Sequence, residues 1–391
     1  MSIVLAKKVI FDIVSSVKGG SGKSTYSLLL AAYYNAQPNT IAYVLDLDLR
    51  GTSWEKNYGK YIKTGFFGDQ NGSPYDNNTL SYYYDVYNEE NPDLREQNKD
   101  MRKRYIEYPF INSLMWNFND FKGKEFWSKI EYRTGSKENI IPLCPACVKS
   151  GSEIDQLEVD IFEHTIAQII LHILNRHRSD DDEEKKVHEV HIIMDMPPNY
   201  EKHAEAVLKH LLTNEGSKLF QMAKKPDGCF KENSGHATKY YLPYQIHLFM
   251  LCAISPAHFE QNSYYLYRWL KDRKYSDGID DLLRDKRFKV SFILNDIANI
   301  LPDLIKHEVP SDTDIATWAQ SVSDQRQADK SSYYKQVISQ IGSSHVVLRA
   351  FPHLSLPATY WYWSTGVSGT TAPRPPLMID QRNADVIKNT L

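Results

Sequence analysis

The chain has few cysteines, no long hydrophobic run and no large excess of charge of one sign. Four cysteines in 391 residues do not suggest a disulfide-stabilised scaffold. No run of about 18 apolar residues is present that could span a bilayer, and residues 1–8 lack the pattern of a signal peptide. The formal net charge is −3, so no global positive field attracts nucleic acid or acidic lipid. These absences predict a cytoplasmic protein that would need a local patch to contact either.

A glycine-rich loop with two lysines stands near the N-terminus. Residues 17–25 read Val-Lys-Gly-Gly-Ser-Gly-Lys-Ser-Thr, between an apolar run at Val9–Val14 and a helical pattern at Ser24–Ala36. A strand, a glycine turn and a helix N-terminus form an anion site, because free backbone N–H groups and the helix dipole favour negative charge. Lys23 would reach the terminal phosphates and Ser24 would bind Mg²⁺. The expected nucleotide-binding residues are Gly19, Gly20, Ser21, Gly22, Lys23, Ser24 and Thr25.

The loop departs from the ordinary P-loop pattern, because Val17 stands where that pattern has its first glycine. The remaining sequence, Lys-Gly-Gly-Ser-Gly-Lys-Ser-Thr, resembles the deviant phosphate loop of the ParA/MinD superfamily of dimerising P-loop ATPases. The resemblance implies that Lys18 reaches across a dimer interface to the partner's nucleotide. It also implies that the cofactors are ATP and Mg²⁺.

Two acidic residues follow the next apolar run. Ile41–Leu47 reads as a strand with Asp46 and Asp48 at its end, and strand alternation would point both side chains to the same side. Ligands of open α/β sheets lie outside the carboxyl ends of the strands. The Asp-x-Asp pattern resembles the first switch segment of ParA/MinD proteins. This resemblance implies that Asp48 assists the attacking water and that Asp46 belongs to the magnesium shell.

Two later strands add candidate residues. Val187–Asp195 is largely apolar and is followed by two prolines after Met196, similar to the second switch segment of this family. Because a carboxylate at the end of a buried strand can hold Mg²⁺, we predict that Ser24 and Asp195 share one ion, Asp195 through water. Asn295 ends a run that resembles the late strand whose asparagine contacts adenine in this family, and no guanine-selecting Asn-Lys-x-Asp sequence occurs. We therefore expect ATP rather than GTP.

Strand-like runs alternate with helical stretches, which predicts a parallel α/β sheet. Two stretches, residues 54–139 and 201–245, are long for connections, and the first is rich in aromatic residues. We predict one three-layer α/β/α P-loop domain over residues 1–391, with a mostly parallel central sheet and two insertions. The insertions could be partner surfaces or enlarged scaffold. The other expected strands are Ile140–Leu143, His247–Ser255, Lys289–Asn295 and His345–Ala350, and the other expected helices are Ile161–Arg178 and one within Asp312–Ile341.

A Cys-x-x-Cys pair at Cys144 and Cys147 has three interpretations. The surrounding Ile-Pro-Leu-Cys-Pro-Ala resembles a ParA-like strand that ends in Pro-Ala, which favours a structural role. Two half-sites from two chains could instead hold one zinc ion, since Cys229 and Cys252 are single and distant. A redox pair would need a helix start near neutralising charge.

Basic residues gather at three places, residues 102–104, 268–274 and 284–289. Any of them could contact phosphate backbones, but acidic neighbours favour solvated surface. The C-terminal stretch Ile379–Leu391 has no basic amphipathic face, which argues against membrane binding of the MinD type.

Three functions remain open at this point. The first is an ATPase that switches between a monomer and an ATP-bound homodimer, in ParA-like partition or positioning, with an activating protein partner and possible DNA binding. The second is a dimeric ATPase that gates or delivers a protein client through the aromatic insertion, without DNA. The third, a metabolic or electron-transfer enzyme, is disfavoured because the cysteine layout gives no obvious cluster ligands. ATP-dependent, salt-sensitive DNA retention would separate the first two.

Overall fold

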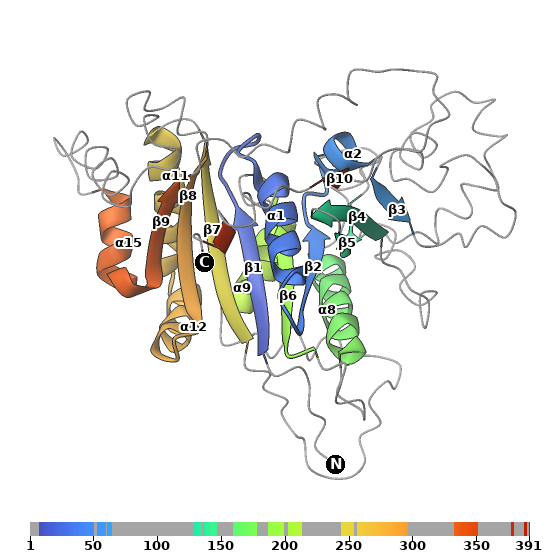
Figure 1. Ribbon diagram of the computed structural model, residues 1–391. Coiled ribbons are helices and arrows are strands. Elements are labelled where there is room, and N and C mark those ends of the chain that lie inside the picture. Colours follow the sequence, from blue (N-terminus) through green and yellow to red (C-terminus); the bar gives the residue numbers. More distant parts are fainter. Residues whose placement is uncertain are drawn as a thin grey trace, which may run out of the picture.

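A mostly parallel β-sheet runs through the protein (Figure 1). The computed structural model describes residues 8–50, 53–59, 61–64, 128–134, 137–146, 159–177, 187–198, 202–212, 244–253, 256–295, 332–350, 377–378, 387–388 and 391. Their ten strands have the order β10-β4-β5-β2-β6-β1-β7-β8-β9, and β3 pairs with β4. The strands are β1 (Lys8–Ser15), β2 (Thr40–Asp46), β3 (Ile62–Thr64), β4 (Ser128–Thr134), β5 (Lys137–Cys144), β6 (Glu189–Asp195), β7 (Tyr244–Ala253), β8 (Phe288–Asn295), β9 (Val346–Ala350) and β10 (Leu377–Met378).

The seven strands from β5 to β9 in this order are parallel, whereas β4 pairs antiparallel with β5 and with β3. Parallel strands are buried on both faces, and β1, β6 and β8 are buried along almost their whole length. In register, Asp195 lies opposite Asp46 on one side and opposite Val14 on the other. The carboxyl ends of β1, β2 and β6 therefore meet at one edge of the sheet.

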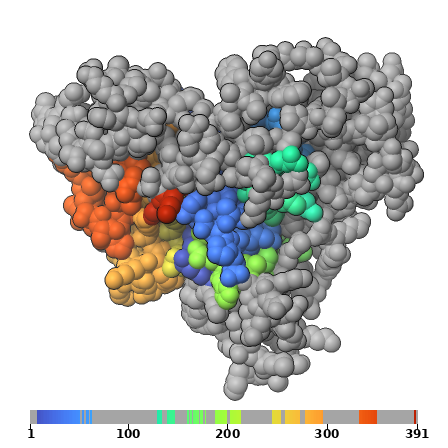
Figure 2. All heavy atoms as spheres, in the orientation of Figure 1, coloured from blue at the N-terminus to red at the C-terminus, as the bar shows by residue number. Residues whose placement is uncertain are grey.

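Helices cover both faces of the sheet and give three layers. Helix α1 packs on one face of the sheet. In Figure 2 it lies in the blue region, with α12 and α15 (orange) on one side and β4 and β5 (teal) on the other. Helices α8, α9, α11, α12 and α15 place apolar side chains in the core of the other face. The predicted α/β/α fold is therefore confirmed. The helices are α1 (Lys23–Asn35), α2 (Ser53–Tyr58), α8 (Val159–Arg176), α9 (Lys202–Leu212), α11 (Pro256–Lys271), α12 (Arg273–Arg284) and α15 (Tyr333–Ile341), with a short 3-10 turn at Ser343–His345.

The structure differs from the sequence expectations mainly at residues 54–139. Part of this stretch adds α2, β3 and β4 to the fold, and residues 202–212 of the second expected insertion form α9. Strand β2 ends at Asp46 and not at Asp48. The aromatic residues at 82–84, Trp116 and Trp127 lie outside the described residues. Within the described helices, none combines the length and the apolar character needed to cross a membrane.

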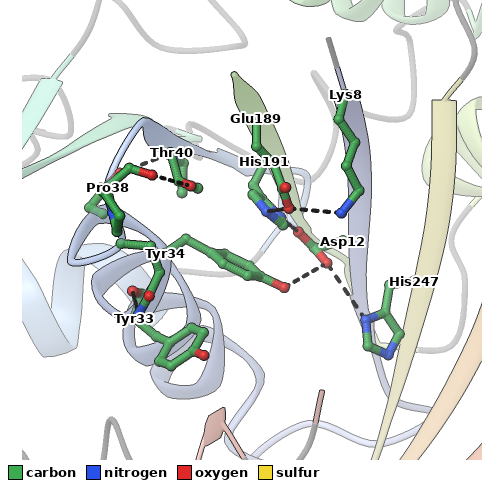
Figure 3. Close-up of polar contacts among 12 residues, drawn as sticks. Lys8, Asp12, Tyr33, Tyr34, Pro38, Thr40, Glu189, His191 and His247 are labelled. Carbon is green, nitrogen blue, oxygen red and sulfur yellow. Dashed lines mark hydrogen bonds and ion pairs between the residues drawn. The ribbon is translucent and has the colours of Figure 1, made fainter. Parts of the chain in front are cut away.

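A cluster of polar side chains is buried beneath the C-terminal end of α1 (Figure 3). Tyr34 stacks on the imidazole of His191 with ring centroids 3.4 Å apart, and its hydroxyl donates to Oδ1 of Asp12 at 3.3 Å. Nδ1 of His191 lies 2.6 Å from Oδ2 of Asp12, and Nε2 lies 2.8 Å from Oε1 of Glu189. An ionised carboxylate accepts hydrogen bonds and donates none. This geometry therefore favours an imidazolium that donates from both nitrogens. The cluster thus joins the end of α1 to β1 and β6.

Charges extend this cluster along and across the sheet. Nζ of Lys8 lies 3.1 Å from Oε1 of Glu189, and Nδ1 of His247 lies 4.0 Å from Oδ1 of Asp12. Burial lowers the pKa of His247 well below its ordinary value, and Lys289 lowers it further. Its Nε2 pairs with the Ser291 hydroxyl at 2.8 Å. We infer that His247 is neutral while His191 carries the charge.

The cluster predicts that stability falls at both ends of the pH range. Burial lowers the pKa of His191, but the nearby carboxylates outweigh this effect and raise the pKa above 6.5. The contribution of His191 to the free energy of unfolding is therefore complete below pH 6.5 and is lost as pH rises through the folded-state pKa. The raised pKa of Asp12, caused by burial, acts in the same direction. The hydrogen bond from His191 lowers the pKa of Glu189 from 4.5 to about 2, so this contribution disappears as pH falls from 4.5 toward 2.

Thermal unfolding midpoints measured from about pH 2 to about pH 9 test this prediction. We expect the alkaline decline to be smaller in His191→Gln than in the wild-type protein. His345→Gln is a control, since this partly buried histidine bonds a backbone carbonyl and not a carboxylate. If the unfolding midpoints of the wild-type protein and of His191→Gln change in parallel with pH, His191 contributes nothing to the pH dependence of stability.

Candidate functional site

The glycine-rich loop connects β1 to α1 at the carboxyl edge of the sheet. Gly20 and Gly22 have φ angles of 74° and 90°, in the left-handed region where side chains are disfavoured. Gly22 also precedes α1, and its carbonyl accepts from the N–H of Tyr26 at 2.8 Å. A Cβ atom added at Gly19 or Gly20 would meet nothing within 4 Å. The loop therefore has open space in front of its backbone at a helix N-terminus, as an anion site requires.

Two buried asparagines fix the loop to neighbouring strands and helices. Oδ1 of Asn262, from α11, accepts from the N–H of Val17 at 3.1 Å, and its Nδ2 donates to the carbonyl of Leu251 in β7 at 3.1 Å. Nδ2 of Asn295, at the end of β8, donates to the carbonyl of Ser21 at 3.1 Å. The structure thus places Asn295 against the phosphate loop, and its contact with adenine remains a prediction.

The two lysines of the loop lie in different environments. Lys23 is 8% exposed and its charge lowers the pKa of Asp195. Lys18 is exposed at the turn that precedes Gly19. Lys23 is thus placed to serve a ligand in its own chain, and Lys18 lies on the outer side of the loop.

Asp195 ends β6 and lies within the same site. Burial raises the pKa of its carboxyl, Lys23 and hydrogen bonds from Ser24 and Trp54 lower it, and the net result is a pKa of about 6. Nε1 of Trp54 donates to Oδ2 of Asp195 at 2.7 Å. Oδ1 is buried and, among the described residues, has no hydrogen-bond partner of good geometry. A buried carboxylate oxygen of this kind suits a hard cation, which prefers oxygen ligands.

Asp46 and Asp48 both lie near Asp195, at the point where β2 ends. Oδ1 of Asp46 accepts from the N–H of Asp48 at 3.1 Å, and Oδ2 accepts from the N–H of Ala146 at 3.2 Å. Burial raises the pKa of Asp46 well above its usual range, and the charges of Asp195 and Asp48 raise it further. Asp46 therefore ties the end of β2 to the end of β5, whereas Asp48 lies half-buried in the following turn. Their roles at magnesium and water remain predictions.

These residues fit a nucleotide with Mg²⁺. The space in front of Gly19 and Gly20 can take phosphate, and Oγ of Ser21 is buried without a hydrogen-bond partner among the described residues. Ser24 and Asp195 can supply oxygen to a cation. No cluster of three or more histidine, cysteine, aspartate or glutamate side chains suited to a metal occurs in the described ranges. Mg²⁺ commonly uses one or two protein oxygens together with substrate phosphates, so this donor set suffices.

The residues of α2 that contact the site were not predicted from the sequence. Trp54 and Tyr58 are each 1% exposed, and Oη of Tyr58 lies 2.8 Å from Oγ1 of Thr25. Both lie in the stretch that we expected to be an insertion. Aromatic residues four apart, the first of them six positions after Asp48, were the available signal for a short helix with one buried face.

The cysteines and basic clusters lie outside this donor set. Cys144 and Cys252 are buried, and burial raises the pKa of both thiols, that of Cys252 to about 12. This accords with a structural role for Cys144, but Cys147 lies outside the described residues, so zinc and redox roles are not tested. Arg284 and Arg287 pair with aspartates at 2.7 and 2.6 Å, as expected for solvated surface. Residues 102–104 lie outside the described residues.

No protein-family model and no curated protein matches the chain. Among solved structures, a ParA family ATPase from Chlorobium tepidum TLS is 14% identical, with 86% of this chain and 99% of that chain covered and a TM-score of 0.29. The structure of pNOB8 ParA is 14% identical over 86% of this chain and 96% of its own, with a TM-score of 0.33. MinD in the MinC:MinD complex of Aquifex aeolicus matches at 13% identity, 85% and 93% coverage and a TM-score of 0.27. The chain is thus similar to these solved structures, at 13–14% identity.

Proposed function

We propose that the protein is a P-loop ATPase that binds ATP with Mg²⁺ and switches between a monomer and an ATP-bound homodimer. The observation that supports this most is the meeting of the open glycine loop, buried Lys23 and the Oδ1 atom of Asp195 at one edge of the sheet. A positive group, backbone donors and an unpartnered carboxylate oxygen together match a phosphate chain that carries a divalent cation.

In this proposal the chain holds the triphosphate and aligns water. Backbone N–H groups of residues 19–22 and the Lys23 ammonium neutralise charge that develops on the phosphate oxygens. Ser24 and Asp195 would hold Mg²⁺, which when bound would offset negative charge on the phosphates. Asp48 would orient a water molecule whose oxygen bonds to the γ-phosphorus while the bond to the bridging oxygen of ADP breaks, and the proton of the water passes to the released phosphate. The products are ADP and phosphate.

The proposed dimer concerns Lys18. Lys23 already provides one buried ammonium group within the chain, and Lys18 is exposed just before the loop. An exposed lysine at this position can reach phosphates bound by a second copy, in the manner implied by the resemblance to ParA/MinD proteins. The further role in partition or positioning, with an activating protein and DNA, is tested by ATP-dependent retention on DNA that weakens as salt rises.

Removal of Mg²⁺ tests the ATPase proposal. Titration calorimetry should show one ATP per chain in the presence of Mg²⁺, weaker binding with excess EDTA and little binding of GTP. Release of phosphate should stop in EDTA, because Ser24 and Asp195 then have no cation to hold against the phosphates. ATP binding and phosphate release that are the same with and without Mg²⁺ would contradict the assigned roles of Ser24 and Asp195.

A further inference from the structure

Helix α2 touches the proposed site through two aromatic side chains. Trp54 donates to Asp195, the last residue of β6, across 141 residues of sequence, and Tyr58 bonds Thr25 in the first turn of α1. The two rings pack against each other with centroids 5.3 Å apart. Since both side chains are buried in the core beneath α1, their positions are fixed by packing.

The indole of Trp54 contacts only one of the two oxygens of Asp195. Its N–H reaches Oδ2, while Oδ1 keeps no hydrogen-bond partner of good geometry among the described residues. An indole N–H donates a hydrogen bond and never accepts one. The nitrogen of Trp54 therefore binds the carboxylate oxygen and does not itself bind a cation. Trp54 thus holds Oδ2, beside the hydrogen bond that Ser24 also gives this carboxyl, and Oδ1 is the oxygen without a partner among the described residues.

We propose that Trp54 is a positioning residue for magnesium, which holds Oδ2 of Asp195 so that Oδ1 is presented to the cation or its water shell. This inference rests on the proposed ATPase function. Groups that orient a metal-binding side chain commonly change metal affinity by about 10-fold to 100-fold when they are removed.

Trp54→Phe tests the proposal because it removes the N–H and keeps an aromatic ring in the core. We expect the Mg²⁺ concentration that half-saturates ATP hydrolysis to rise by about 10-fold or more. ATP affinity in EDTA should stay nearly unchanged, because the N–H that is lost bonds Asp195 and not the backbone of the glycine loop. A general loss of structure would raise the half-saturating Mg²⁺ concentration and also lower the ATP affinity in EDTA.

Trp269→Phe is the matched control. Trp269 lies in α11, is 4% exposed and belongs to the core on the opposite face of the sheet. The same substitution there should lower the thermal unfolding midpoint without changing the Mg²⁺ half-saturation. Equal shifts of Mg²⁺ half-saturation in both variants would overturn the specific role of Trp54.

The failure of this inference can be separated from failure of the proposed function. If the wild-type protein binds no nucleotide, the ATPase proposal fails and this inference fails with it. If wild-type hydrolysis depends on Mg²⁺ and Trp54→Phe has the same Mg²⁺ half-saturation, only the role of Trp54 is overturned. Should Trp54→Phe not fold, fluorine NMR of wild-type protein labelled with fluorotryptophan replaces it. Mg²⁺ added to the ATP complex should then shift a resonance among the seven tryptophans, and no shift would contradict the proposal.

Discussion

Replacing Lys23 with alanine should weaken ATP binding by on the order of 100-fold, the largest effect on affinity that we expect from one substitution. Lys23 is the buried ammonium group of the loop, and its charge already acts on Asp195. Alanine removes the positive charge from a site where water cannot screen the phosphates. Titration calorimetry with ATP and Mg²⁺ measures the loss directly.

Lys18→Ala is the control for this prediction, because it removes the other lysine of the same loop. Lys18 is exposed, and a single chain should bind ATP with nearly the same affinity without it. The two variants should therefore separate binding within a chain from completion of the site by a second chain. Equal ATP affinities for Lys23→Ala and the wild-type protein would show that the nucleotide does not lie on this loop.

Asp48→Asn should lower the rate of ATP hydrolysis by about 100-fold to 1,000-fold while ATP still binds. The substitution keeps the size of the side chain but removes the carboxylate that we assign to the attacking water. Asp48 is half-buried in the turn after β2, where its charge raises the pKa of both Asp46 and Asp195. Phosphate release under single-turnover conditions measures the chemical step without product release.

Asp285→Asn, on the exposed turn after α12, is a control for loss of one negative charge and should hydrolyse ATP at the wild-type rate. A second consequence distinguishes a role in chemistry from a role in binding. Slow hydrolysis should prolong the ATP-bound dimer in Asp48→Asn. If Asp48→Asn retains wild-type hydrolysis, another group orients the water.

The strands and the loop could be predicted from the sequence because each depends on local pattern. The apolar run from Val9 to Val14, the glycines after it and the helical pattern beyond them specify β1, the turn and α1 without any distant contact. Strand β4 carried a similar signal, since Ile130 and Tyr132 alternate with polar residues and are buried. It was missed because the long interval around it was interpreted as an insertion.

The predicted end of β2 was wrong, and the reason is a local hydrogen bond between residues two apart. Oδ1 of Asp46 accepts from the N–H of Asp48, which is the pattern of an Asx turn, and this turn stops the strand at Asp46. Strand alternation therefore does not extend to Asp48. A strand-ending Asp-x-Asp sequence is compatible with both arrangements, so the sequence alone did not decide between them.

The contacts that hold the site in place could not be predicted, because they join distant parts of the chain. Asn262 binds the N–H of Val17 from 245 residues away, and Trp54 binds Asp195 from 141 residues away. Periodicity identifies the face that each element buries but does not tell which side chains meet at the edge of the sheet. Identification of these partners required the strand order.

The most direct test of the central claim is the solution mass of Asp48→Asn with ATP and with ADP, in the presence of Mg²⁺. The proposed switch predicts a dimer with ATP and a monomer with ADP, and adding Lys18→Ala to the same protein should restore the monomer with ATP bound. A monomer in every condition, or a dimer that persists with ADP and without Lys18, would contradict an ATP-dependent dimer completed by the second chain.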